Sequence, residues 1–157
     1  MATKEDIVSG IQQVVVEAKR VAGILDARAD WDVKRSQGWT PKEVFCHLAS
    51  VAGMFPMMGP AMLSAGEDAD MTQSNDVSQL NAASIASLEK LTPAQLVQAL
   101  EANCAKTIDW VKALGDDQMT AKMTFAQLKV PAGDILENIA VLHASHHLYE
   151  AVMPVAL

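Results

Sequence analysis

Apolar residues recur at steps of three and four along most of the chain, the spacing that aligns side chains on one face of an α-helix. Residues 4–27 carry one continuous apolar face of this kind and predict a long first helix. A second helix should begin after Thr40. Pro41 suits its first turn, and Glu43 can complete a capping box with the threonine hydroxyl.

The second predicted helix contains residues that usually interrupt helices. Pro56, Gly59 and Pro60 should kink or end it, because proline lacks the backbone N–H that the helix needs. The polar stretch of residues 64–75 is the clearest linker in the chain, and a third helix should follow over residues 76–90.

The second half of the chain repeats the same start signals. Thr92, followed by proline and then by Gln95, predicts a fourth helix that ends before Gly115 as its C′ residue. Residues 123–130 show weak alternation, which favours an extended arm. Pro131 should start the last helix. The sum predicts an all-α protein, an antiparallel bundle with a four-helix core.

Composition narrows the class of protein. A chain of 157 residues is one domain, residues 1–157, long enough for a real core. Half of the residues are hydrophobic, yet no apolar run approaches the roughly 20 residues of a membrane span, so no membrane role is expected. A formal charge of −7 argues against a nucleic-acid partner. The N-terminal residues do not resemble a signal peptide, which favours a cytoplasmic protein.

The four histidines gather in two short segments. His143 and His147 are one helical turn apart, so two imidazoles share one face with Glu150. His47, on the second predicted helix, also falls on an apolar face. His146 should point away from the His143–His147 axis.

This pattern allows a metal site or an ordinary core. A single inward histidine is usually a hydrogen-bonded core residue, whereas two inward histidine sites on different helices can meet at one ion. His47, His143 and His147 are therefore candidate ligands of a divalent metal. Three neutral imidazoles would leave coordination positions open, as in catalytic sites. Ala144 after His143 excludes an HExxH motif, and no ExxH pair suits a di-iron bundle.

Two motifs resemble those of a known superfamily. The run GWTPKEVFCHLAS is similar to the second-helix signature of the DinB/YfiT-like bundles, and HASHHLYE is similar to their HxxHHxGQ motif. This superfamily includes the N-terminal domain of mycothiol-dependent maleylpyruvate isomerase and bacterial thiol transferases. The resemblance implies an up-down-down-up four-helix bundle, here with a short extra helix or extended arm. It also implies nickel or zinc held by His47, His143 and His147, and homodimers.

The chain departs from the superfamily motif at two positions. Tyr149 and Glu150 replace its glycine and glutamine. Glu150 is the candidate catalytic residue, as a general base, a hydrogen-bond partner of a ligand or a ligand itself. Alternatively, the helix frays before this residue and the carboxylate is solvated. We expect Cys46 to face a neighbouring helix and Trp39 to serve as a packing staple rather than contact a ligand.

Three functions remain open at this stage. The first is a metal-dependent enzyme that activates a low-molecular-weight thiol for S-transfer or isomerisation of a small-molecule substrate. The second is a metal-dependent hydrolase with Glu150 as base. The third is a non-catalytic, stress-related or partner-binding bundle. A two-fold homodimer is expected in each case, with the first helix and part of the last as candidate faces.

Overall fold

The computed structural model describes residues 1–35, 38–68, 77–125 and 128–153. Helices dominate these residues, and a small two-stranded sheet accompanies them. The helices are α1 (Lys4–Arg28), α2 (Pro41–Ala65), the short 3₁₀ turn η1 (Gly66–Asp68), α3 (Val77–Leu88), α4 (Pro93–Ala113), α5 (Asp116–Thr120), α6 (Ala132–Glu137), the π-helical η2 (Asn138–His143) and α7 (Ala144–Val152). The strands are β1 (Lys122–Phe125) and β2 (Leu128–Pro131).

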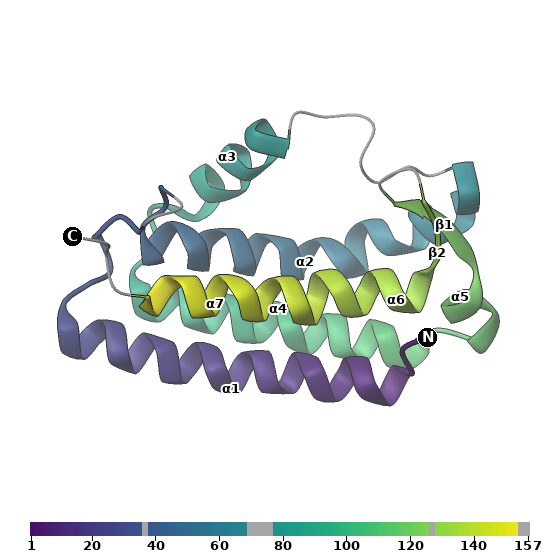
Figure 1. Cartoon of the computed structure of the whole chain (residues 1–157), viewed down its shortest axis with the longest axis horizontal. Coiled ribbons are helices and arrows are strands. Elements are labelled where there is room, and N and C mark those ends of the chain that lie inside the picture. Colours follow the sequence, from purple (N-terminus) through teal and green to yellow (C-terminus); the bar gives the residue numbers. More distant parts are fainter. Residues whose placement is uncertain (36–37, 69–76, 126–127, 154–157) are drawn as a thin grey trace.

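Four long helical segments form an up-down-down-up bundle, as the resemblance to the DinB/YfiT-like bundles implies (Figure 1). The first, α1, runs one way, α2 and α4 run the other way, and the continuous segment α6–η2–α7 returns in the direction of α1. Two neighbours that run the same way need a long connection. That connection contains α3, which lies outside the bundle against the first half of α2.

Capping boxes begin three of the long helices. Thr40 Oγ1 accepts the Glu43 amide at 3.2 Å, and the Glu43 carboxylate accepts the Thr40 amide at 2.7 Å. Thr92 and Gln95 repeat this arrangement at the start of α4. Both were predicted from local sequence alone. A third box, formed by Thr3 with Asp6, starts α1.

Of the two predicted effects of Pro56, Gly59 and Pro60, a kink or an end of the second helix, the end is wrong. The helix α2 continues to Ala65 with Pro56 and Pro60 inside it. Pro56 has no N–H to offer the carbonyl four residues earlier, that of Ala52. The buried Thr107 hydroxyl, from α4, donates to this carbonyl at 2.7 Å. A side chain of the neighbouring helix therefore supplies the hydrogen bond that the proline cannot make.

The expected extended arm is a β-hairpin. Its strands β1 and β2 pair antiparallel, with Met123 opposite Val130. Pro131 ends the second strand and caps α6, so it does not itself start the last helix as expected. The predicted third helix is described from Val77 on. Its expected first residue, Asp76, and most of the expected linker, residues 69–75, lie outside the described residues.

The last helical segment is not α-helical throughout. Residues Asn138–His143 form a π-helix, which has more residues per turn than an α-helix. A face drawn at 100° per residue therefore shifts as it passes through this stretch. Leu136 before the π-helix and Ala144 after it are buried, whereas Ile139 and Ala140 within it are half-buried.

One described stretch, Pro41–Asp68, is long and apolar enough to cross a membrane by length and composition alone. Its most apolar 18 residues have a mean hydropathy of 1.3, and 17 % of them are buried. A single such helix is weak evidence, because a core helix can pass the same test. Here α2 packs against α3, α4 and α7, as a bundle helix does.

Candidate metal centre

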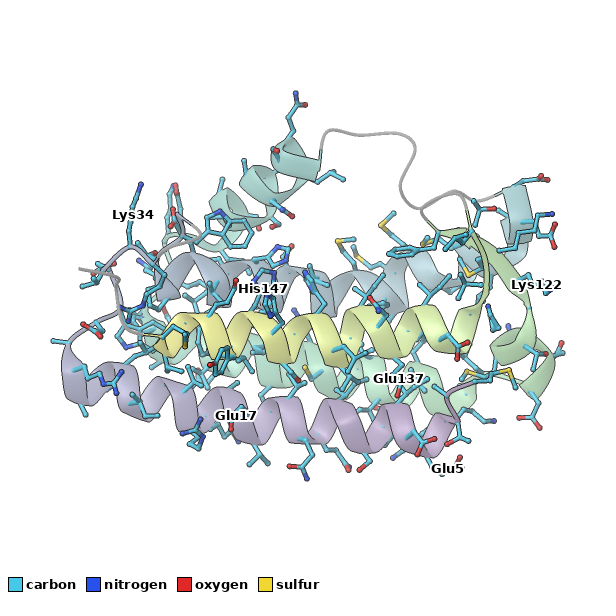
Figure 2. The ribbon with its side chains drawn as sticks, viewed as in Figure 1. Glu5, Glu17, Lys34, Lys122, Glu137 and His147 are labelled. Atoms are coloured by element: carbon cyan, nitrogen blue, oxygen red, sulfur yellow. The ribbon has the colours of Figure 1, made fainter. Side chains whose placement is uncertain are left out.

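Three histidine side chains converge between α2 and the last helical segment. His47 comes from the second turn of α2, His143 ends the π-helix and His147 lies one turn later on α7. One ring nitrogen from each lies within 4.8 Å of the others. The Nε2 atoms of His143 and His147 are 3.0 Å apart. The convergence predicted for these three residues is therefore present, and His147 is labelled in Figure 2.

Hydrogen bonds fix which nitrogen of two of the rings faces the cluster. His147 Nδ1 lies 3.1 Å from Glu150 Oε2, so it is the protonated nitrogen and Nε2 keeps its lone pair toward His143. His47 Nδ1 lies 3.5 Å from the Ser84 hydroxyl, which itself donates to the Asn81 carbonyl at 2.9 Å. Ser84 can therefore accept from His47, which leaves His47 Nε2 with a lone pair.

The cluster is electrostatically neutral near pH 7. Burial lowers the pKa of His47 to about 4, and the neighbouring imidazoles add to the effect. Burial, followed by the charges of His147 and His146, lowers the pKa of His143 to about 4. Burial also lowers the pKa of His147, while Glu150 opposes that shift. Neutral imidazole is the form that binds metal.

Trp39 and Ser84 complete the surroundings of the triad, and neither role was predicted from the sequence. The Trp39 ring stacks on His147, with centroids 5.5 Å apart and planes at 22°, and also contacts His47 at 5.1 Å. Trp39 was expected to be a packing staple. Its place directly before the cap of α2, two turns from His47, was the available signal. Ser84 had none, because it comes from α3, distant in sequence.

Glu150 lies on the outer side of His147. Its two carboxylate oxygens contact His147 Nδ1 and, at 3.2 Å, His146 Nε2. The helix α7 is intact here, and the Glu150 side chain is 24 % exposed, so it is neither frayed nor fully solvated. This contact is that of a hydrogen-bond partner to a candidate ligand. His146 points outward, with its side chain 66 % exposed, as expected.

The two cysteines stay apart from the cluster. Cys46 and Cys104 are buried free thiols, and Cys46 is absent from the group of candidate ligands. Burial raises the pKa of the Cys46 thiol and raises that of Cys104 to about 11. Both are therefore protonated, unreactive core residues near neutral pH.

The donor set suits a divalent metal ion. His47 Nε2 is buried and has no hydrogen-bond partner among the described residues. Unpartnered buried nitrogens are costly unless a ligand satisfies them. Two nitrogens on one tetrahedral zinc ion are about 3.4 Å apart, so the widest pair here, within 4.8 Å, needs to close by no more than about 1.4 Å. Within the described residues, no carboxylate or thiolate joins the three imidazoles.

Two solved structures share this fold. YfiT from Bacillus subtilis, described as a probable metal-dependent hydrolase with an unusual four-helix bundle topology, matches with a TM-score of 0.69 and 16 % identity. The match covers 94 % of this chain and 83 % of YfiT. A mycothiol-dependent maleylpyruvate isomerase matches with a TM-score of 0.73 and 17 % identity. It covers 98 % of this chain, which spans 62 % of the isomerase.

Sequence comparison agrees with the fold. No curated protein sequence matches the chain significantly. The family model of the DinB superfamily matches residues 18–151, which include all three histidines of the cluster and Glu150. The match extends over most of the chain, from the second half of α1 to α7. The protein therefore belongs to the DinB superfamily.

Proposed function

We propose that His47, His143 and His147 bind one divalent ion, zinc or nickel, at the catalytic centre of an enzyme that activates a thiol. The observation that supports this most is the close set of neutral ring nitrogens, with 3.0 Å between two of them and a buried, unpartnered Nε2 on the third residue. Three imidazoles leave coordination positions free, which is typical of catalytic rather than structural sites.

The bound ion would supply one kind of chemistry, since a divalent cation lowers the pKa of a thiol or water that it binds. The protein side chains do the rest. Glu150 holds His147 in the tautomer with a free Nε2, and Ser84 does the same for His47. Trp39 covers the ring of His147 and keeps solvent from that side.

Thiol activation is favoured over hydrolysis by the surroundings of the cluster. Hydrolysis is helped by a base that takes a proton from water, and the predicted candidate, Glu150, contacts His146 and His147 on the outer side of the triad. A thiol needs only to ionise to become a nucleophile. The dependence of the similar isomerase on mycothiol supports the same choice.

Metal-dependent hydrolysis with Glu150 as base is the second candidate. The likeness to YfiT, described as a probable metal-dependent hydrolase, favours it. A panel of small thiols with electrophilic acceptors, run beside a panel of ester and amide substrates, separates the two activities in metal-loaded protein.

Metal binding is tested with protein purified without a histidine tag. Elemental analysis and calorimetric titration with zinc and nickel should give about one ion per chain. His147→Ala should abolish this stoichiometric binding, whereas His146→Ala, the adjacent and outward-facing histidine, should leave it unchanged. Protein that binds neither metal would favour the third possibility, a non-catalytic bundle.

We also propose that the protein forms a two-fold homodimer. The helices expected at the interface carry exposed apolar side chains, Val16 on α1 and Tyr149 on α7, each 61 % exposed, and Leu142 in the π-helix. Exposed apolar side chains of this size favour burial against a second copy. Light scattering at micromolar concentration should give twice the mass of the chain.

A further inference from the structure

An apolar cavity begins where the histidine cluster ends. It lies between the second half of α2 and the last helical segment, and has a volume of about 160 Å³. Its walls carry Met54, Met58 and Met62 from α2, together with Trp110 from α4 and Ile135 from α6. Figure 2 shows the side-chain sulfur atoms gathered along this half of α2.

The cavity is apolar except at one end. Every lining side chain but one is aliphatic, aromatic or a thioether, the exception being His143. The same histidine belongs to the triad. Its Nδ1 is buried and has no hydrogen-bond partner among the residues that the structure describes. The cavity and the candidate metal centre therefore share one imidazole ring.

Glycine shapes the part of the wall where Trp110 lies. A Cβ atom at Gly59 would lie 2.2 Å from the Trp110 ring, so only glycine lets the indole lie against α2 at this point. Trp110 in turn stacks on Phe55, with centroids 6.5 Å apart. Packing holds Trp110 in place, whereas the lining methionines of α2 are flexible and adapt to what they contact.

Size and lining together select a class of occupant. Enclosed apolar cavities of about 150 Å³ accept a molecule the size of benzene, and this cavity offers similar space although it opens to solvent beside Met54 and Met58. Cavities for larger ligands typically exceed about 300 Å³. A charged group would lose its hydration here without gaining a partner. The occupant that fits is one neutral aromatic ring or a branched hydrocarbon group of about six carbons.

We propose that this cavity, lined by the α2 methionines and Trp110 and ending at His143, binds the apolar part of the substrate. A thiol attached to such a group would lie at the His143 end of the cavity, beside the triad. The substrate class is then a small apolar thiol or thioether rather than a sugar-like or multiply charged one. This role in substrate binding rests on the proposed metal centre, whereas the affinity of the cavity for an apolar group does not.

The chain offers a matched pair of positions for a test. Met58 lines the cavity and is 48 % exposed, and its neighbour Met57 is 75 % exposed and does not line it. Both side chains reach solvent, so aspartate at either position should leave the fold intact, which circular dichroism checks. Met54→Asp, at a lining position that is 40 % exposed, replaces Met58→Asp if the latter does not fold.

Three probes then separate the cavity from the metal centre in calorimetric titrations. Toluene has the ring alone, 2-mercaptoethanol the thiol alone, and benzyl mercaptan both. Toluene should bind the metal-free protein at one site. Met58→Asp should weaken this binding at least tenfold relative to the unchanged protein, whereas Met57→Asp should leave it unchanged. Benzyl mercaptan should bind zinc-loaded protein at least tenfold more tightly than either other probe.

Each result decides a different claim. Absence of toluene binding to the metal-free protein, or equal losses in the two aspartate variants, overturns the assignment of the cavity. Zinc binding without any advantage for benzyl mercaptan also overturns it, because the cavity and the ion would not serve one ligand. If zinc does not bind, the proposed metal centre fails, and the toluene titration alone decides whether the cavity takes an apolar group.

Discussion

The two halves of α2 have opposite surroundings although they belong to one helix. In the first half, Val44, Phe45 and Ala49 are completely buried, and His47 is only 4 % exposed. In the second half, exposed methionines alternate with the few buried positions, and Met57 is 75 % exposed. The first half packs under α3 and against α7, whereas the second half borders the apolar cavity.

This difference separates two requirements of a catalytic site. Metal ligands need fixed positions, and the closely packed first half provides them because the side chains around His47 cannot move independently. A substrate cavity needs space and adaptable walls, which the methionine-rich half provides. One helix thus joins a rigidly packed candidate ligand, His47, to an adjustable cavity.

Truncation of a core side chain should expose this difference most strongly. Phe45 is fully buried and contacts Trp31 edge to face, with ring centroids 5.0 Å apart. Phe45→Ala should lower the free energy of unfolding by about 3–5 kcal/mol. Met57→Ala, in the exposed second half of α2, should change the free energy of unfolding by less than about 0.5 kcal/mol. Urea denaturation measures both. Similar losses would show that the two halves do not differ in packing.

Acid should destabilise the protein through His47, in the buried first half of α2. The pKa of His47 is about 4 in the folded protein and about 6.5 when unfolded, so the unfolded chain takes up the proton first as the pH falls. The metal-free protein should therefore lose stability between pH 6.5 and pH 4, by about 2.5 kcal/mol at pH 4.5 from His47 alone. Denaturation curves at pH 7 and 4.5 should show a smaller loss in His47→Gln, and an equal loss in both proteins would contradict this origin.

The hydrogen bond from Thr107 should matter only because Pro56 lies in α2. Thr107→Val leaves the Ala52 carbonyl without a donor and should cost about 2 kcal/mol. In a Pro56→Ala background, a backbone N–H is available to that carbonyl, so the same change should cost clearly less. A double-mutant cycle in urea measures the coupling. Equal costs in both backgrounds would mean that the hydroxyl does not compensate for the proline.

The carboxylate of Glu150 supports the triad from outside and should have the smallest of these effects. Glu150→Gln keeps the size of the side chain but removes its charge, and should weaken zinc binding about tenfold through His147. Calorimetric titration measures this affinity. A variant that binds zinc normally but is inactive toward its substrate would instead identify Glu150 as the catalytic base.

Much of the fold was readable from the sequence because its signals are local. The cap formed by Thr40 and Glu43, the apolar face of α1 and the turn between His143 and His147 each depend on residues within one or two turns. The rest depends on contacts between distant segments. Nothing near Pro56 shows that Thr107 will supply its missing hydrogen bond, so the continuous helix was not predicted.

The candidate site divides in the same way. Its ligands were predicted because histidine spacing and an inward face are properties of single helices. The approach of Ser84 to His47 depends on the path of α3 over the bundle, and the stacking of Trp39 on His147 joins segments more than 100 residues apart. The π-helix before His143 has no sequence signature comparable to a cap.

The most direct test of the account is the position of a metal ion beside the buried first half of α2. Crystals of the protein, grown after zinc loading and without a histidine tag, should give one strong anomalous peak per chain. The peak should lie about 2.0–2.1 Å from a ring nitrogen of each of His47, His143 and His147. An anomalous map without a peak among these rings, or with zinc bound only by the exposed His146, would contradict the central claim.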